Sequence, residues 1–427
     1  MKKLKIGPVR IGLAGLGNVG RGVYEILRKD AEILQKRSGV QFEIVAVSAR
    51  SKKDFVDPKI KFYSNPIDLA NDSEIDVVVE VMGGIDVAKN LIEASLKNRK
   101  NVVTANKALL AQYGFEISQI AEQNNLSVGF EAAVAGAIPI IKIFKEGLVA
   151  NEIEEFYAIL NGTCNFILTK MQRENLYFSI ALKQAQELGY AEVDPTFDID
   201  GTDTAHKLTI LSSIASGSKP AFSQISIEGI DKIGIDDIKL ALGLGYKIKL
   251  LAVYKKTPKG VQQAVYPAII PLTEKIANVD DSFNAILTKA SNANWNFSVG
   301  RGAGSLPTAS AIVADLVDIS FNQTSNMFGV KNNDLVEASI SSISDRVGGY
   351  FLSLVVDKNL AQNGDLAKTI FGEKIVVVQA NFIDAGEEIL CGFLTGEQRE
   401  GDIIAALKMV DQRLVKAIKF LRVESAF

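Results

Sequence analysis

The chain has 427 residues, of which 47% are hydrophobic and 23% are charged. These fractions are close to the average for globular proteins and exclude a disordered tail, a collagen-like fibre and a coiled-coil rod. The 47 Lys and Arg residues against 50 Asp and Glu give a formal net charge of −3, without the basic surface that nucleic-acid binding needs. The charge balance therefore argues against a nucleic-acid partner. No run of about 18 apolar residues occurs, so we expect no membrane partner either.

Cysteine and histidine are too scarce for several kinds of site. The two cysteines, Cys164 and Cys391, cannot form a disulfide framework, and the single histidine, His206, rules out a Cys/His metal cluster. We expect His206 to be a packing or surface residue. The first apolar stretch follows basic residues, as in a signal peptide, but Pro8, Arg10 and glycines interrupt it, so we interpret it as a strand of a cytoplasmic protein.

Short apolar runs alternate with helical patterns over the first 150 residues. The expected strands are Val9–Ala14, Phe42–Ala49, Asp76–Val81, Asn101–Thr104 and Leu126–Ala132, and the expected helices are Val19–Lys36, Val87–Leu96 and Leu109–Gln123. This alternation predicts βαβ units and a parallel sheet. The apolar runs are continuous, which is typical of strands covered on both faces.

The middle of the chain has a different pattern. Its expected strands are Ile153–Leu160, Gln263–Ile270 and Asn296–Val299, and its expected helices are Phe178–Leu188, Thr204–Ala215 and Pro307–Ile319. Polar residues alternate with apolar ones in the later strands, which predicts an antiparallel sheet. The stretch Phe321–Ser344 is rich in Asn and Ser without periodicity and is predicted to be a linker.

The pattern from Gly348 onwards predicts a further unit with the order β-α-β-β-α-β. Its expected strands are Tyr350–Val356, Lys374–Ala380, Ile389–Thr395 and Ile418–Arg422, and its expected helices are Leu360–Ile370 and Ile403–Lys416. This order is the ferredoxin-like arrangement.

A glycine-rich turn follows the first expected strand and opens a helix. Its residues are Gly15, Gly17, Asn18, Val19 and Gly20, together with an intervening leucine. The glycines allow a tight turn and close approach of the backbone to a pyrophosphate, and the helix N-terminus offers free N–H groups to the phosphates. Such turns also occur without ligands, but a strand before it and a helix after it favour dinucleotide binding.

The residues after the second expected strand bear on the choice between NAD and NADP. An NAD site usually has an acidic residue there to hold the ribose 2′-hydroxyl. Here Ser48–Lys53 contains no acid, and Arg50 can stack on adenine and pair with a 2′-phosphate. The alternative is that Arg50, Lys52 and Lys53 belong to a solvated loop. We favour NADP, with NAD possible.

Two further segments carry candidates for proton transfer. Lys107 follows the strand Asn101–Thr104, at the sheet edge where ligands bind in open α/β sheets, although a surface lysine would also suit that position. The segment Glu192–Lys207 is the densest acidic stretch. Asp203 and Lys207 are four residues apart on one helix face, which is typical of an ion pair. In the alternative interpretation the carboxylates hold a substrate ammonium and Lys207 moves a proton.

Six segments taken together resemble homoserine dehydrogenases. They are GLGNVG at 15–20, TANKALLAQYG at 104–114, EAAVAGAIPII at 131–141, NGTCNFIL at 161–168, LGYAEVDPTFDIDGTDTAHKL at 188–208 and GRGAGSLPTASAIVADL at 300–316. The occurrence of all six segments in this order is a far more specific signal than any one segment alone. The resemblance implies NAD(P)-dependent interconversion of L-aspartate 4-semialdehyde and L-homoserine, a step toward threonine, methionine and isoleucine.

The resemblance also implies roles for individual residues. Lys207 would be the general acid/base for hydride transfer, and Lys107 would lie near the nicotinamide and the substrate. Glu192 would bind the substrate amino group, and Asp198 and Asp203 would orient the substrate. Lys107 and Asp203 would be catalytic residues together with Lys207.

The same resemblance implies a cofactor site and a cation site. The resemblance gives Gly15, Gly17, Asn18, Val19, Gly20, Lys107, Gly189 and Gly302 as cofactor-binding residues, and the residue-level argument above adds Arg50. A monovalent cation, Na⁺ or K⁺, would be held by Glu131 with the main-chain carbonyls of Val134, Gly136 and Ile138. Oxygen ligands of this kind suit a hard cation.

The C-terminal unit resembles an ACT domain, a module that often binds amino acids. Arg346–Leu352 matches the usual entry into that domain, but Asp357–Ala361 lacks the Pro-Gly expected at the ligand-binding turn. Threonine binding and a purely structural role are both open, and we favour the structural role.

The sequence therefore predicts an α/β protein of three parts. These are an N-terminal Rossmann-type dinucleotide-binding domain (1–136 plus about 305–330), an α+β substrate-binding and dimerisation domain (137–304) and a C-terminal ferredoxin-like, ACT-type domain (346–427). The resemblance implies a homodimer or homotetramer acting on a small-molecule substrate.

Two other functions compete with this one. The first is a different Rossmann dehydrogenase of amino-acid metabolism, in which Glu192 or Lys207 could be replaced without loss of homoserine oxidation. The second is a non-catalytic nucleotide sensor, which would bind NADP without turning over homoserine. The complete set of Lys107, Glu192, Asp203 and Lys207 argues against a sensor.

Overall fold

A computed structural model describes residues 7–321, 326–361 and 365–425, and the structural statements below refer to these residues. The N-terminal part contains a six-stranded parallel sheet in the order β3-β2-β1-β4-β5-β6. Its strands are β1 (Val9–Ala14), β2 (Phe42–Ser48), β3 (Lys61–Tyr63), β4 (Val77–Glu80), β5 (Asn101–Thr104) and β6 (Val128–Gly129). This order is that of the Rossmann fold, as predicted. The last strand is shorter than the expected Leu126–Ala132, because a 3₁₀ turn begins at Glu131.

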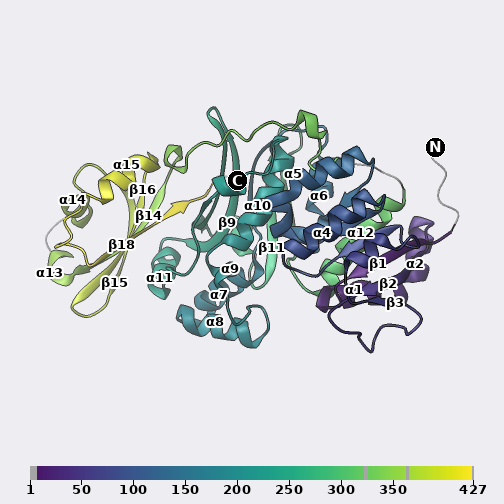
Figure 1. Ribbon diagram of the computed structural model, residues 1–427. Helices are drawn as coiled ribbons and strands as arrows, with labels where there is room; N and C mark the ends of the chain where they lie inside the picture. Colours follow the sequence, from purple (N-terminus) through teal and green to yellow (C-terminus); the bar gives the residue numbers. More distant parts are fainter. Residues whose placement is uncertain (1–6, 322–325, 362–364, 426–427) are drawn as a thin grey trace.

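Helices cover both faces of this sheet (Figure 1). They are α1 (Asn18–Lys29), α2 (Ala31–Ser38), α3 (Ile67–Asn71), α4 (Asp86–Lys97), α5 (Lys107–Gln123) and α12 (Ser305–Ser320). The single helix expected over Val19–Lys36 is wrong, because Asp30 leaves the helical conformation at φ −103° and ψ 15° and divides it into α1 and α2. Helix α12 packs against α1, and Ser305 Oγ donates to the Asn18 carbonyl at 2.5 Å.

The middle of the chain forms the predicted antiparallel sheet. Its strands are β7 (Ile153–Ile159), β9 (Tyr246–Thr257), β10 (Gly260–Pro271), β11 (Phe283–Ala290) and β12 (Asn294–Arg301), in the order β12-β11-β7-β9-β10, and β8 (Ser226–Ile227) joins the far side of β10. The accompanying helices are α6 (Ile140–Lys142), α7 (Gly162–Glu174), α8 (Phe178–Glu187), α9 (Thr196–Ile199), α10 (Thr202–Ser216) and α11 (Ile235–Gly243).

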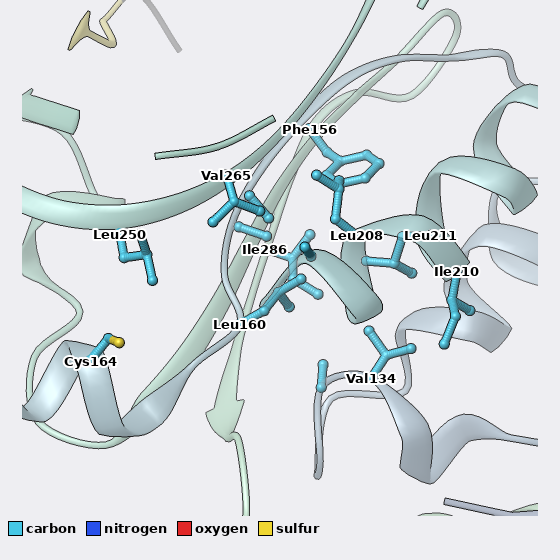
Figure 2. Packing of buried hydrophobic residues seen from close by; sticks show 14 of the residues in the cluster. Val134, Phe156, Leu160, Cys164, Leu208, Ile210, Leu211, Leu250, Val265 and Ile286 are labelled. Carbon is cyan, nitrogen blue, oxygen red and sulfur yellow. The ribbon is translucent and has the colours of Figure 1, made fainter. Parts of the chain in front are cut away.

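The helix α10 is buried between this sheet and the Rossmann domain. Leu208 and Leu211 of α10 share one apolar cluster with Phe156 of β7, Val265 of β10 and Ile286 of β11 (Figure 2). On its other side, α10 contacts α5 of the Rossmann domain. The helix therefore places its polar side chains where the two domains meet.

The C-terminal unit has the predicted ferredoxin-like order. Its elements are β14 (Tyr350–Asp357), α13 (Lys358–Ala361), α14 (Leu366–Phe371), β15 (Val377–Asp384), β16 (Glu388–Thr395), α15 (Glu400–Leu407) and β18 (Ala417–Val423), with the short pair β13 (Val347–Gly348) and β17 (Gln398–Arg399). The strands lie in the antiparallel order β18-β14-β16-β15. Two expected boundaries were wrong: α15 occupies 400–407 rather than 403–416, and β15 begins at Val377. The helix expected over Leu360–Ile370 corresponds to α13 and α14, with 362–364 outside the described residues.

The sheets of the middle and C-terminal parts are continuous. Strand β18 pairs in parallel with β10, with Arg422 opposite Ala268 and Val423 opposite Ile269. Figure 1 shows β18 running from the C-terminal unit back toward β9, where the chain ends. The C-terminal unit is thus connected to the middle of the molecule by backbone hydrogen bonds, which its sequence pattern did not predict.

The predicted linker over Phe321–Ser344 has few regular elements, as expected, but it packs on the Rossmann domain. Residues 322–325 lie outside the described residues. Phe328 is buried with its ring centroid 6.4 Å from that of Phe130, and Ser118 Oγ donates to Asn332 Oδ1 at 2.5 Å. In the described parts of the chain, no helix has the length and apolar character needed to cross a membrane.

Candidate active site

The glycine-rich turn lies between the ends of β1 and β4, beside the end of β2. Gly15 has φ +104°, and its N–H donates to the Ser48 carbonyl at 2.9 Å. A Cβ on Gly20 would lie 1.9 Å from the Gly15 carbonyl oxygen, so α1 approaches the strand as closely as a glycine permits. A Cβ on Gly17 would meet nothing within 4 Å, and α1 begins after Gly17 without a side-chain cap. Open space before free N–H groups fits a dinucleotide pyrophosphate.

Arg50 follows β2 on the same edge of the sheet. Its side chain is exposed, as are those of Lys52 and Lys53. The hydrogen bond between Gly15 and Ser48 joins the end of β2 to the glycine-rich turn. This arrangement leaves Arg50 available to a ligand that extends from the turn across the end of β2.

Lys107 is held at the carboxyl edge of the sheet by a chain of hydrogen bonds. Thr104 Oγ1 at the end of β5 donates to Glu80 Oε2 of β4 at 2.6 Å, and it accepts from the Asn106 N–H at 3.1 Å. Asn106 Oδ1 accepts from the Leu109 N–H at 3.1 Å and thereby caps α5, whose first residue is Lys107. Burial raises the pKa of Glu80, whose bonds to Thr104 and to the backbone oppose that rise.

Asp203 joins Lys107 to Lys207. Its Oδ1 lies 2.8 Å from Lys107 Nζ and its Oδ2 lies 2.7 Å from Lys207 Nζ. Lys207 Nζ also donates to the Leu160 carbonyl at the end of β7, at 2.7 Å. The carboxylate therefore links the N-terminus of α5 in the Rossmann domain to α10 in the middle domain, and both predicted lysines lie in one cluster.

Asn161 is a site residue that the sequence interpretation missed. Its Nδ2 donates to Asp198 Oδ1 at 2.7 Å and to Asp203 Oδ2 at 2.8 Å, so one amide holds two carboxylates together. Its Oδ1 accepts from the Cys164 N–H at 2.7 Å and caps α7. An Asn before a helical pattern is a signal for a cap, but no local signal reveals its contacts with residues 37 and 42 positions later.

The two lysines have opposite pKa shifts. The charge of Asp203 raises the pKa of Lys107, whose side chain is 41% exposed. Burial lowers the pKa of Lys207, although the charge of Asp203 opposes this. Burial alone would raise the pKa of Asp203, but the charges of Lys207 and Lys107 hold it below its ordinary value. Lys107 therefore keeps its proton to a higher pH than Lys207 does.

The other predicted substrate residues lie around this cluster. Asp198, on α9, bonds to Asn161, and burial raises its pKa. Glu192 lies in the loop between α8 and α9 with an exposed side chain, near enough for its charge to raise the pKa of Lys107. Gly189, in the same loop, has φ +74° and open space around its α-carbon. His206 points elsewhere, as predicted: it is buried with its ring 4.5 Å from that of Phe222.

Gly302 contacts the site through Asn284. A Cβ on Gly302 would lie 2.1 Å from Asn284 Oδ1, and Asn284 Nδ2 donates to the Leu160 carbonyl at 3.3 Å. That carbonyl is the one that accepts from Lys207. The absence of a side chain at Gly302 therefore allows the segment before α12 to approach the hydrogen-bond partners of Lys207.

The predicted cation loop begins at Glu131, whose side chain reaches the start of α6. Both carboxylate oxygens of Glu131 already accept hydrogen bonds, from the Ile141 N–H at 2.8 Å and the Lys142 N–H at 3.0 Å. Burial raises the pKa of Glu131 to about 7. The Ile138 carbonyl accepts from the Ile140 N–H at 2.8 Å, whereas Gly136 has φ +61° and turns the loop. In this structure each Glu131 carboxylate oxygen accepts one backbone hydrogen bond at the start of α6, which leaves a lone pair on each oxygen for a cation.

A Rossmann sheet with an open glycine-rich turn, and with a lysine–carboxylate cluster at the carboxyl edge of the same sheet, fits a nicotinamide-dinucleotide-dependent oxidoreductase. Two family models match the chain: one described as homoserine dehydrogenase covers residues 139–317, and one described as homoserine dehydrogenase, NAD binding domain, covers residues 15–131. The chain belongs to the homoserine dehydrogenase family. It is an NAD(P)-dependent oxidoreductase of that family, as its motifs predicted.

Individual relatives and solved structures match over most of the chain. The homoserine dehydrogenase of Neisseria gonorrhoeae is 40% identical over 98% of this chain and 99% of its own, and that of Pseudomonas aeruginosa is 39% identical over 95% and 96%. A crystal structure of a homoserine dehydrogenase from Thiobacillus denitrificans superposes with a TM-score of 0.89 at 38% identity, covering 98% of each chain. A hyperthermophilic archaeal homoserine dehydrogenase in complex with NADPH has a TM-score of 0.63 at 26% identity, covering 74% of this chain and 98% of that one.

Alanine at Gly17 and at Gly20 should have different effects. Gly20→Ala places a Cβ against the Gly15 carbonyl and should lower the free energy of unfolding by about 1–3 kcal/mol. Gly17→Ala meets no protein atom, so stability should change by less than about 0.5 kcal/mol while NADPH binding weakens. Urea unfolding and fluorescence titration with NADPH measure the two quantities. Wild-type NADPH affinity in Gly17→Ala would show that the turn does not hold the pyrophosphate.

Proposed function

We propose that Lys207 exchanges a proton with the substrate oxygen during interconversion of L-homoserine and L-aspartate 4-semialdehyde. The observation that carries this proposal is the position of Lys207 Nζ, buried between the Asp203 carboxylate and the Leu160 carbonyl. When bound, the nicotinamide dinucleotide supplies the two-electron redox chemistry. The residues of this chain bind the substrate and exchange a proton with its oxygen.

The two lysines have different tasks in this mechanism. An amine whose pKa is lowered by burial can both take up and release a proton near neutral or alkaline pH, which suits Lys207 as the general acid/base. Lys107 keeps its proton because Asp203 raises its pKa, so it provides positive charge beside a developing alkoxide. Asp203 orients both ammonium groups through its two oxygens.

The carboxylates around the cluster suit the amino group of the substrate. Glu192 is exposed and close enough to Lys107 to affect its pKa, so we assign it to the substrate ammonium. Asp198 is fixed by Asn161 beside Asp203, and we assign it to orienting the substrate. In the direction of homoserine oxidation, the proton leaves the hydroxyl for the neutral amine of Lys207.

Replacement of Lys207 by methionine should remove turnover without removing cofactor binding. We expect kcat for homoserine oxidation to fall by about 100-fold or more, because the proton acceptor is lost while the glycine-rich turn is untouched. Steady-state assays of reduced cofactor at 340 nm, with an NADPH titration as the control for folding, test this. A kcat within a few-fold of the wild type would disprove the assignment.

We further propose that the cofactor is NADP(H) and that Arg50 binds its 2′-phosphate. The support is the exposed guanidinium next to the end of β2, without an acidic residue in Ser48–Lys53. Arg50→Ala should raise the Kd of NADPH by about tenfold with little effect on NADH, because one charge-assisted contact is lost. The exposed Lys53→Ala in the same loop is the matched control. An equal rise in the Kd of NADPH and of NADH would show that Arg50 does not distinguish the two cofactors.

We also propose that Na⁺ or K⁺ binds in the loop 131–138, to Glu131 and the main-chain carbonyls of Val134, Gly136 and Ile138. The support is the turn at Gly136, whose α-carbon lies against the backbone of Arg301 and Gly302, next to Asn284. A cation bound there should raise the melting temperature when choline chloride is replaced by NaCl or KCl at equal ionic strength, because it binds only the folded chain. Melting curves and kcat that are identical in all three salts would contradict a cation site.

A further inference from the structure

A buried arginine connects the C-terminal unit to the middle domain. Arg422 of β18 is 2% exposed, and its Nε and Nη2 donate to the two oxygens of Glu400, at 2.8 Å and 2.6 Å. Its Nη1 and Nη2 also donate to the two oxygens of Glu228, at 3.0 Å and 2.7 Å. The guanidinium stacks 4.4 Å from the ring centroid of Tyr266. Every nitrogen of this guanidinium therefore binds a carboxylate, and the planar geometry determines where Glu228 lies.

The segment that follows Glu228 contacts the turn before α10. A Cβ on Gly229 would lie 2.1 Å from the Ile199 carbonyl oxygen and 2.6 Å from the Asp200 α-carbon. The Ile230 N–H donates to that same Ile199 carbonyl at 2.8 Å. On the other side, the Glu228 N–H donates to the Val265 carbonyl of β10 at 2.8 Å. Residues 228–230 are thus packed between β10 and the turn, with no space for a side chain at Gly229.

That turn connects two carboxylates of the active site. Asp198 precedes it at the end of α9, and Asp203 follows it in the first turn of α10. Gly201 at its centre has φ +91°, and a Cβ there would lie 3.0 Å from Ile227 Cγ2. A displacement of the turn 199–201 would shift Asp203, in the first turn of α10, more than Lys207, which lies one helical turn further on. It would therefore move the Asp203 carboxylate relative to the partners that hold it.

We propose that Glu228 is a positioning residue for the reaction: held by Arg422 of the C-terminal unit, it fixes the turn 199–201 and thereby the Asp203 carboxylate against Lys207. This inference rests on the proposed proton exchange by Lys207. It makes the C-terminal unit a part of the catalytic geometry, whether or not that unit binds an effector.

The variant Glu228→Gln tests the proposal with little risk to folding, since the Glu228 side chain is 41% exposed and Arg422 keeps Glu400. We expect kcat for homoserine oxidation to fall by at least about threefold with an unchanged Kd for NADPH. The limb of the kcat–pH profile that reports Lys207 should move to lower pH by about 0.3 unit or more, because a less closely held Asp203 supports the ammonium form less. The titratable groups that interact with Lys207 or lie around it are Asp203, Lys107, Asp198, His206 and Cys164.

Lys419→Gln is the matched control. Lys419 lies on the same strand, is 44% exposed, and joins the C-terminal unit to α11 through Asp237 at 2.8 Å. Lys419 does not belong to the segment 228–230 that contacts the turn 199–201. The variant Lys419→Gln should therefore have the wild-type kcat and the wild-type kcat–pH profile. An equal loss in both variants would mean that general loosening of the C-terminal unit is responsible, and the positioning role would be wrong.

A second variant changes Arg422, the residue that holds Glu228. Arg422→Lys keeps the charge but cannot bind two carboxylates in a planar manner, so it should shift the same pH limb in the same direction, and the double variant with Glu228→Gln should add little. Lys207→Met is measured in parallel. If Lys207→Met keeps turnover, the proposed proton exchange fails. If it abolishes turnover while Glu228→Gln retains the wild-type kcat and pH limb, only the positioning role is overturned.

Discussion

The pairing of one carboxylate with two lysines is the constraint on which the site depends. Asp203 and Lys207 are buried, and an unpaired charge in that position would be strongly destabilising. Because Lys107 comes from the Rossmann domain, the same carboxylate also determines how that domain meets α10. The lysine–carboxylate cluster and the domain contact are therefore one interaction, and the cluster is complete only when the cofactor-binding domain is correctly placed.

Three separate segments converge on the partners of that cluster. Leu160 at the end of β7 provides the carbonyl for Lys207, and Asn284 at the start of β11 donates to the same carbonyl. The turn before α10 lies against Gly229, which follows the residue held by Arg422. The proposed proton exchange by Lys207 needs such support, because the reactivity of a buried amine changes with small displacements of its partners.

The elements with strong local signals were predicted well. The glycine-rich turn, the parallel order of the first sheet and the strand order of the C-terminal unit follow from periodicity and turn residues, and the structure confirms them. The spacing of Asp203 and Lys207 also predicted their shared helix face. The helix break at Asp30 and the early end of α15 were not predicted, since a weak break in a helical pattern has little local signal. The homodimer or homotetramer and the structural role favoured for the C-terminal unit stay predictions.

The sequence by itself determined the fold class, the family and most candidate site residues, because these depend on local patterns and ordered motifs. Only the tertiary structure decided that Lys107 pairs with Asp203 and that Asn161 joins two carboxylates. The structure likewise decided that Glu131 accepts hydrogen bonds from the backbone N–H groups of Ile141 and Lys142. It also decided that burial lowers the pKa of Lys207 while Asp203 raises that of Lys107. Each of these results depends on which distant segments exclude water from one another, and that is a property of the packed chain rather than of any short stretch of it.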